Sequence, residues 1–262
     1  MENHLSDTST PDPQGSAPLH PPALEALDGP YFVPWGRNEL RRLFLRTAIL
    51  LATILVIATY SQLPGLLVLA VPVLLFAAIG VLFFRNPRRR STSDPSVLVS
   101  PADGKVVDVR RVEEGEFLDG PALQVGIFLS IFDVHVNRAP GDCTVEFLRY
   151  RPGAFHDARD EKCSRENESQ SIGVRLSTVA GIPGDPVLVR QISGAIARRI
   201  ICPLEPGNTL VQGGLVGMIK YGSRTEIFVP LRPGAPSNWE AAVRPGDRVR
   251  GGESVVFKRT PR

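Results

Sequence analysis

The sequence predicts a β-dominated protein, with a mostly antiparallel sandwich or barrel-like domain preceded by a hydrophobic α-helical membrane hairpin. Two observations predict this. A long charge-free apolar block lies near the N-terminus, and short β-rich runs separated by Gly, Pro and Asp follow it. Pro and Gly each occur 24 times in 262 residues, which favours many turns. We therefore divide the chain into a disordered Pro-rich tail (1–36), a membrane hairpin with basic flanks (37–90) and a folded domain (91–262).

The first 30 residues have the composition of a tail. They include six prolines, no Lys or Arg and few large apolar side chains. Such a segment cannot bury enough apolar surface to offset the entropy of ordering. It also lacks the basic start and apolar centre of a signal peptide. We therefore expect it to be disordered.

The membrane hairpin is predicted from 38 consecutive positions, Thr47 to Phe84, without a charged residue. One helix of that length would extend about 57 Å, whereas the hydrocarbon core of a bilayer is about 30 Å thick. Two helices, roughly 44–62 and 66–84, fit better, with the break at Pro64-Gly65. Because the first helix is short for a full span, a re-entrant hairpin in one leaflet is the alternative.

The flanks of the hairpin predict its orientation. Four arginines precede it and four follow it, whereas the turn between the helices has no charge. Basic residues next to spans stay in the cytoplasm. Both ends, and the folded domain, are therefore expected on the cytoplasmic side of the cell membrane. The same arginines could attract anionic lipid headgroups.

The folded domain is expected to consist of short strands. A helical turn is predicted over Ala195–Ile201, ended by Pro203. The predicted strands are Val97–Ser100, Lys105–Val112, Leu123–Leu129, Cys143–Tyr150, Gly173–Leu176, Val187–Ile192, Thr225–Val229 and Ser254–Lys258.

Composition argues against two classes of function. The net charge is only +3, and basic runs with interleaved aromatics are missing, so a nucleic-acid partner is not expected. The three cysteines, Cys143, Cys163 and Cys202, are far apart and form no CxxC or Cys/His spacing. No metal site is predicted, and the thiols fit a reducing compartment.

Two polar motifs lie beside predicted strands. The run Ser100-Pro-Ala-Asp-Gly-Lys-Val106 is a turn in which Asp103 caps and glycine takes a positive φ. The segment 128–140 runs from an apolar strand into Asp133, His135 and Asn137, which would share one face if that strand continued. His135 and His156 are the two histidines outside the tail and are the candidates for proton transfer near neutral pH.

The third motif, residues 213–230, places Gly222-Ser223 between two apolar runs. Gly-Ser is a permitted two-residue β-hairpin loop. It is also the pair that backbone self-cleavage requires, because glycine tolerates the strained geometry. In that reaction the Ser223 hydroxyl attacks the Gly222 carbonyl to form an ester. β-Elimination then gives dehydroalanine, which hydrolyses to a pyruvoyl group.

Together these motifs resemble the phosphatidylserine decarboxylase family, in particular its short branch. The matching strings are SPADGKV, FLSIFDVHVNRAP and GMIKYGSRTEIFVP, and YRPGAF with Asn167-Glu168 also fits. The resemblance covers about residues 85–257. It implies cleavage between Gly222 and Ser223, a larger chain 1–222 that stays with chain 223–262, and a pyruvoyl cofactor derived from Ser223. The implied reaction converts phosphatidylserine to phosphatidylethanolamine and CO₂ through a Schiff base, in phospholipid biosynthesis.

The resemblance also implies site residues. The longer branch of the family uses an Asp–His–Ser triad for self-cleavage, and Asp103 and Ser223 fall at matching positions. That branch has two histidines three residues apart, whereas this chain has His135 and then Arg138. His135 is predicted to serve cleavage, decarboxylation or both, and to donate the proton that follows loss of CO₂. His156 is expected to be incidental, and a homodimer is common in the family.

Three alternatives remain at the level of the sequence. The substrate could be a related serine-headed lipid such as archaetidylserine, because the motifs concern only the headgroup. The domain could be a tethered carrier without chemistry, like biotinyl or lipoyl modules, with Lys220 at a hairpin tip. A pyruvoyl enzyme for a soluble amino acid is the third, although a soluble substrate needs no membrane anchor.

Overall fold

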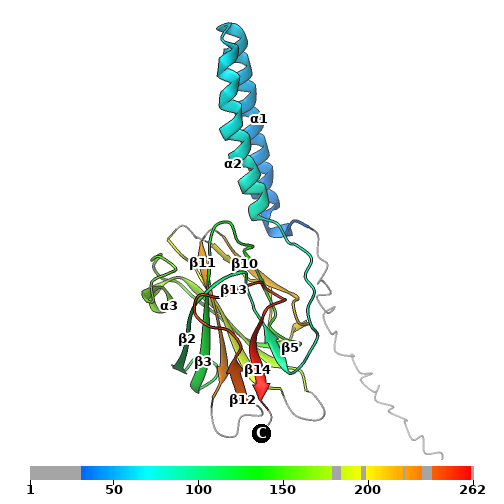
Figure 1. Ribbon diagram of the computed structural model, residues 1–262, viewed down its shortest axis with the longest axis vertical. Coiled ribbons are helices and arrows are strands. Elements are labelled where there is room, and N and C mark those ends of the chain that lie inside the picture. The colour runs from blue at the N-terminus through cyan, green and yellow to red at the C-terminus, as the bar shows by residue number, and fades with distance from the viewer. Residues whose placement is uncertain (1–30, 179–183, 196–198, 221, 232–237, 261–262) are drawn as a thin grey trace, which may run out of the picture.

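Two long helices project together from one end of a β domain in the computed structural model (Figure 1). The structure describes residues 31–260 apart from 179–183, 196–198, 221 and 232–237. Residues 1–30 of the predicted tail (1–36) therefore lie outside the described residues. The last strand ends at the opposite end of the β domain (Figure 1).

The hairpin is formed by helix α1 (Arg37–Tyr60) and helix α2 (Ala70–Phe83), joined through the 3-10 helix η2 (Pro64–Leu69). The apolar side chains of both helices are largely exposed. The stretches Pro34–Tyr60 and Pro64–Phe83 are long and apolar enough to cross a membrane, which suggests membrane association. The break at Pro64-Gly65 is where the sequence predicted it.

Residues 31–36, which the sequence assigned to the tail, pack at the base of the hairpin instead. The amide of Val33 donates to the carbonyl of Phe84 at 3.2 Å, and Val33 is buried. A 3-10 helix, η1 (Pro34–Gly36), then leads into α1. A Cβ on Gly36 would lie 2.3 Å from the Phe84 ring, so only glycine lets this ring pack there. The apolar contact explains why the hairpin segment begins before residue 37.

The described part of the β domain contains short antiparallel strands and one short helix, α3 (Lys162–Glu166). The strands are β1 (Val97–Val99), β2 (Gly104–Glu114), β3 (Gly120–Leu129), β4 (Val136–Arg138), β5 (Cys143–Arg151), β6 (Ser169–Leu176), β7 (Pro186–Ile192), β8 (Arg199–Ile201), β9 (Thr209–Leu210), β10 (Leu215–Lys220), β11 (Ser223–Pro230), β12 (Asn238–Ala241), β13 (Arg248–Val249) and β14 (Val255–Thr260).

These strands form an eight-stranded sheet and two three-stranded sheets. The large sheet has the order β13-β2-β3-β11-β7-β6-β5-β9, and the small ones are β1-β14-β12 and β4-β10-β8. All the strand pairs are antiparallel. One hydrophobic core joins the large sheet to the β1-β14-β12 sheet, with members such as Ile127, Val189, Ile227 and Phe257. The predicted antiparallel, sandwich-like fold is confirmed.

Two local predictions were wrong, and the hairpin alternative for Gly222-Ser223 does not hold. The end of the predicted helix over Ala195–Ile201 is strand β8, because Arg199–Ile201 pairs with β10; residues 196–198 lie outside the described part. Asp133 and His135 do not share a strand face with Asn137, because Ser130–Asp133 forms a turn and β4 begins only at Val136. Strands β10 and β11 do not form a hairpin, because each pairs only with other strands.

Candidate active site

The Gly222–Ser223 peptide bond lies where the chain passes from one sheet to another. β10 ends at Lys220 in a three-stranded sheet, and β11 begins at Ser223 in the middle of the eight-stranded sheet. Gly222 has a φ of +53°, in the left-handed region, which costs a residue with a side chain about 1–2 kcal/mol. Glycine is thus required by the backbone at the residue whose carbonyl the sequence predicted to be attacked.

The Ser223 hydroxyl is buried and lacks a hydrogen-bond partner among the described residues. Its backbone pairs with Leu129 of β3 at the end of the β11 ladder. Buried side-chain oxygens nearly always have a partner. The Ser223 hydroxyl, next to a glycine in the left-handed conformation, is therefore available for a reaction and is not used to stabilise the fold by a hydrogen bond to the described residues.

The His135 imidazole lies against the amide of Gly222. Gly222 N donates to Nε2 at 3.3 Å, while Nδ1 lies 3.0 Å from the backbone carbonyl oxygen of Asp133. That carbonyl can only accept, so we assign the ring hydrogen to Nδ1, and the lone pair of Nε2 accepts from the Gly222 amide. Burial lowers the pKa of His135 to about 4, outweighing the Asp133 interactions that raise it. The ring is therefore neutral near pH 7 and is a base.

The carbonyl of Gly222 lies against Gly194, just beyond the end of β7. A Cβ on Gly194 would be 2.2 Å from the Gly222 oxygen, so a side chain at position 194 would displace that carbonyl. Continuing the strand register by one residue from Arg224–Ile192 places Ser193 opposite Ser223. The Ser193 hydroxyl, too, is buried and has no hydrogen-bond partner in the part of the chain that the structure describes.

Asp103 lies near this end of the sheet but is bonded to other groups. Its carboxylate accepts from Arg89 at 2.7 Å and from the amide of Gly251 at 2.7 Å. Burial raises its pKa above the usual value, with Arg89 opposing that shift. None of the contacts of the described residues joins Asp103 to His135 or Ser223. The structure therefore places His135 at the amide nitrogen of Gly222 and Ser223 at the next peptide bond, with Asp103 outside these contacts.

The SPADG turn is nevertheless fixed to the same region. The carbonyl of Pro101 accepts from the backbone amide of Arg138 at 2.9 Å, and Asn137 donates to the hydroxyl of Thr225 at 2.9 Å. The three sequence motifs are thus linked through β4 and β11, although they are far apart in the chain. The other candidate histidine, His156, is half-exposed and lies 2.9 Å from Glu166 on the surface.

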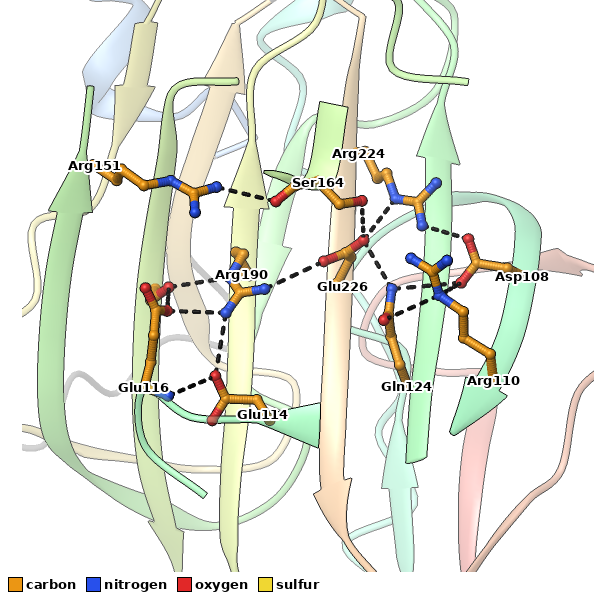
Figure 2. A network of polar contacts seen from close by, with 11 residues as sticks. Asp108, Arg110, Glu114, Glu116, Gln124, Arg151, Ser164, Arg190, Arg224 and Glu226 are labelled. Atoms are coloured by element: carbon orange, nitrogen blue, oxygen red, sulfur yellow. Dashed lines mark hydrogen bonds and ion pairs between the residues drawn. The ribbon is translucent and has the colours of Figure 1, made fainter. Parts of the chain in front are cut away.

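A network of charged groups fixes the start of β11 on the opposite face of the sheet (Figure 2). Arg224, next to Ser223, donates to Glu226 at 2.9 Å and forms an ion pair with Asp108. Glu226 also accepts from Gln124 at 2.8 Å and from Ser164 of α3 at 2.6 Å. The two charged side chains of β11 are each 1% exposed. This network fixes the position of Arg224, the residue after the Gly222–Ser223 junction.

Several residues at the site were not found from the sequence. Phe83 of α2 packs on His135 with ring centroids 4.3 Å apart, and Glu39 of α1 forms an ion pair with Lys220. Neither contact has a local signal, because the partners are far apart in sequence. Gly194 lies two residues after the predicted strand Val187–Ile192, which pairs with β11. This position at the end of a strand was the signal that could have found it.

Taken together, these features define a β-sheet protein with a buried serine and a neutral histidine at one left-handed Gly-Ser junction, attached to an apolar helical hairpin. The family model described as phosphatidylserine decarboxylase matches residues 76–257. The phosphatidylserine decarboxylase proenzyme of Carboxydothermus hydrogenoformans is 48% identical over 176 residues, 67% of this chain and 78% of the relative. The proenzyme of Rhodopirellula baltica is 39% identical over 227 residues, 87% of this chain and 88% of the relative. The chain belongs to the phosphatidylserine decarboxylase family, and it is therefore a decarboxylase.

Proposed function

We propose that the chain is made as a precursor, cleaves itself between Gly222 and Ser223, and then decarboxylates phosphatidylserine to phosphatidylethanolamine. The observation that carries this proposal is the unbonded, buried hydroxyl of Ser223 beside Gly222, with His135 Nε2 at the Gly222 amide. This arrangement fits the precursor of a pyruvoyl group, because the hydroxyl that would be consumed makes no hydrogen bond to the described residues.

His135 is the base in the proposed cleavage. Ser223 Oγ bonds to the carbonyl carbon of Gly222 while its proton passes to Nε2, and the amide nitrogen of Ser223 leaves with that proton. The product is an ester between the Gly222 carboxyl group and the Ser223 side chain. Loss of the Ser223 α-proton expels the Gly222 carboxylate and leaves dehydroalanine. Water then releases ammonia, so that chain 223–262 begins with a pyruvoyl group.

The polar partners have separate proposed roles. A neutral His135 with its hydrogen on Nδ1 is oriented by the Asp133 carbonyl, as a base requires. Asp103 is proposed to act on cleavage indirectly, by fixing the SPADG turn against the hairpin flank through Arg89. Gly194 leaves room for the Gly222 carbonyl. Asp103 is therefore proposed to fix the SPADG turn without contacting Ser223.

The two chains would remain together after cleavage. β11 lies between β3 and β7 over most of its length, and every residue in it is buried. β14 pairs with β1, and β13 pairs with β2, so the small chain contributes strands to two sheets. Separating the chains would expose the core of the domain.

Once formed, the pyruvoyl carbonyl supplies an electron sink for the amine-bearing carbon of the substrate headgroup. His135, after accepting a proton, is the proposed donor that protonates the α-carbon when CO₂ has left. Phe83 and the cluster around it keep this ring away from water. The buried site thus limits side reactions of the carbanion.

The hairpin is the proposed anchor in the cytoplasmic membrane, with the β domain on the cytoplasmic side. Arginines flank both ends of the hairpin. Ile131 and Phe132 are exposed, and the Phe132 carbonyl accepts from Arg85 at the end of the hairpin at 2.6 Å. This apolar loop beside the helices would contact the interface, so that lipid acyl chains stay in the bilayer while the headgroup reaches the site. A homodimer remains a prediction.

Burial of Lys220 argues against the carrier alternative. The side chain is 5% exposed and is paired with Glu39, so it is not presented at a hairpin tip for modification. The proposed activity is tested by incubating purified protein with phosphatidylserine vesicles and with soluble phosphoserine, and measuring CO₂ release. We expect release from the vesicles only. Equal release from phosphoserine would contradict a membrane-lipid substrate.

A further inference from the structure

The last residue of β10 is bonded mainly to the membrane hairpin. Lys220, two positions before Gly222, forms an ion pair with Glu39 of α1 and donates to the carbonyl of Trp35 at 3.4 Å. Its ammonium group also lies 5.7 Å from the ring centroid of Phe84, within range of a cation–π interaction. The Lys220 side chain is 5% exposed and that of Glu39 is 31% exposed. A charge buried to this degree depends on its partners.

The hairpin also contacts the other side of the junction. Phe83, the last residue of α2, packs on the His135 ring at a centroid distance of 4.3 Å and an interplanar angle of 38°. It belongs to a buried cluster with Val134, Val136 and Met218, which surround His135 and β10. Neighbouring residues at the base of the hairpin thus contact both Lys220, at the end of the strand that leads into the junction, and the imidazole of His135.

We propose that the hairpin base, defined as Trp35, Glu39, Phe83 and Phe84, is a positioning element of the self-cleavage site. It fixes Lys220, and hence the approach to Gly222, and it holds His135 in place. The inference rests on the proposed self-cleavage and extends it: the hairpin is part of the processing site as well as an anchor. Cleavage should therefore proceed only when the two helices are seated on the β domain.

Variants of the Glu39–Lys220 ion pair distinguish a positioning role from a general effect on stability. Glu39→Gln leaves the Lys220 ammonium buried without its carboxylate, and Lys220→Met removes the charge itself. If both act through one contact, the double variant should be no slower than the slower single variant. Lys220→Arg keeps a charge at the site and should restore cleavage. Glu205→Gln, at an exposed loop carboxylate, is the matched control.

The experiment is cell-free synthesis of the full chain with vesicles that lack phosphatidylserine, stopped at intervals and separated on a denaturing gel. We expect Glu39→Gln and Lys220→Met each to slow conversion to two chains by about a hundredfold, the effect of a small misplacement of reacting groups. Lys220→Arg and Glu205→Gln should cleave at close to the wild-type rate. Wild-type rates in both single variants would overturn the inference, whereas failure of the wild-type chain to cleave would overturn the proposed function instead.

A second measurement decides the case if the ion-pair variants do not fold. Phe83→Ala lets water reach His135, so its pKa should rise towards the ordinary value while Asp133 and Arg85 stay in place. The acid limb of the cleavage rate against pH should move to higher pH. Phe83→Leu, which keeps the ring covered, should leave it unchanged. An unmoved limb in Phe83→Ala would overturn the role of the hairpin base.

Discussion

The two strands that meet at the Gly222–Ser223 bond are supported in different ways. Downstream, β11 is buried along its whole length in the middle of the eight-stranded sheet, and Arg224 and Glu226 are held in the network of Figure 2. Upstream, β10 lies in a three-stranded sheet, and its last residue is held by Trp35 of η1 and Glu39 of α1. Ser223, the residue proposed to become the cofactor, therefore lies at the start of the strand buried in the large sheet. The carbonyl proposed to be attacked, that of Gly222, follows the strand whose end is held by the hairpin.

Ser223→Ala gives the largest expected effect, because it removes the nucleophile while leaving both supports intact. Since the hydroxyl has no hydrogen-bond partner among the described residues, its loss should leave the fold as stable as before. We expect one uncleaved chain and no decarboxylation. The measurements are a denaturing gel and CO₂ release from vesicles, and a cleaved, active variant would contradict the assigned junction.

Gly194→Ala tests whether cleavage depends on the position of the Gly222 carbonyl, on the upstream side of the junction. The new Cβ would lie 2.2 Å from the Gly222 oxygen, so the carbonyl must move. We expect cleavage to slow by about a hundredfold. Gly115→Ala, where a Cβ meets nothing within 4 Å, is the control and should cleave normally. A wild-type cleavage rate in Gly194→Ala would show that cleavage does not depend on the position of the Gly222 carbonyl.

The pH dependence of cleavage tests the state of His135. The neutral ring is the base, and burial keeps its pKa at about 4. The rate should therefore be flat from about pH 8 to pH 5.5 and fall by about tenfold per unit below the folded-state pKa. Circular dichroism of Ser223→Ala at each pH checks that the chain stays folded. A decline centred near pH 6.5 would mean that the ring is exposed in the reacting state.

Glu226→Gln probes the downstream strand, β11, and should change cleavage least. It leaves Arg224 buried with one carboxylate fewer, and breaking a buried pair costs about 3–5 kcal/mol of stability. When Glu226→Gln is added to the uncleavable Ser223→Ala variant, we expect a lower urea midpoint of unfolding. When Glu226→Gln is made in a chain that keeps Ser223, we expect the folded protein to cleave at close to the wild-type rate. Glu146→Gln, at an exposed ion pair, should cost about 0–1 kcal/mol. Equal midpoints for the two variants would show that the network does not hold β11.

The sequence predicted the features that depend on local pattern. The charge-free run and Pro64-Gly65 gave the two helices, and alternating apolar runs gave the long strands. Strand partners could not be predicted in this way, because Gly222-Ser223 is equally compatible with a hairpin and with a passage between sheets. The contact between Glu39 and Lys220 spans 181 positions and was missed for the same reason. The roles of Ser223 and His135 stay predictions, although the sequence motifs named both residues and the structure places both next to Gly222. The contact of Asp103 with Arg89 depends on tertiary packing and had no local signal.

The intact mass of the purified protein under denaturing conditions tests the central claim most directly. The account predicts two masses, one for residues 1–222 and one for residues 223–262 with the serine converted to a pyruvoyl group. Ser223→Ala should give one full-length mass. A single full-length mass from folded, membrane-inserted wild-type protein would contradict self-cleavage at the Gly222–Ser223 junction.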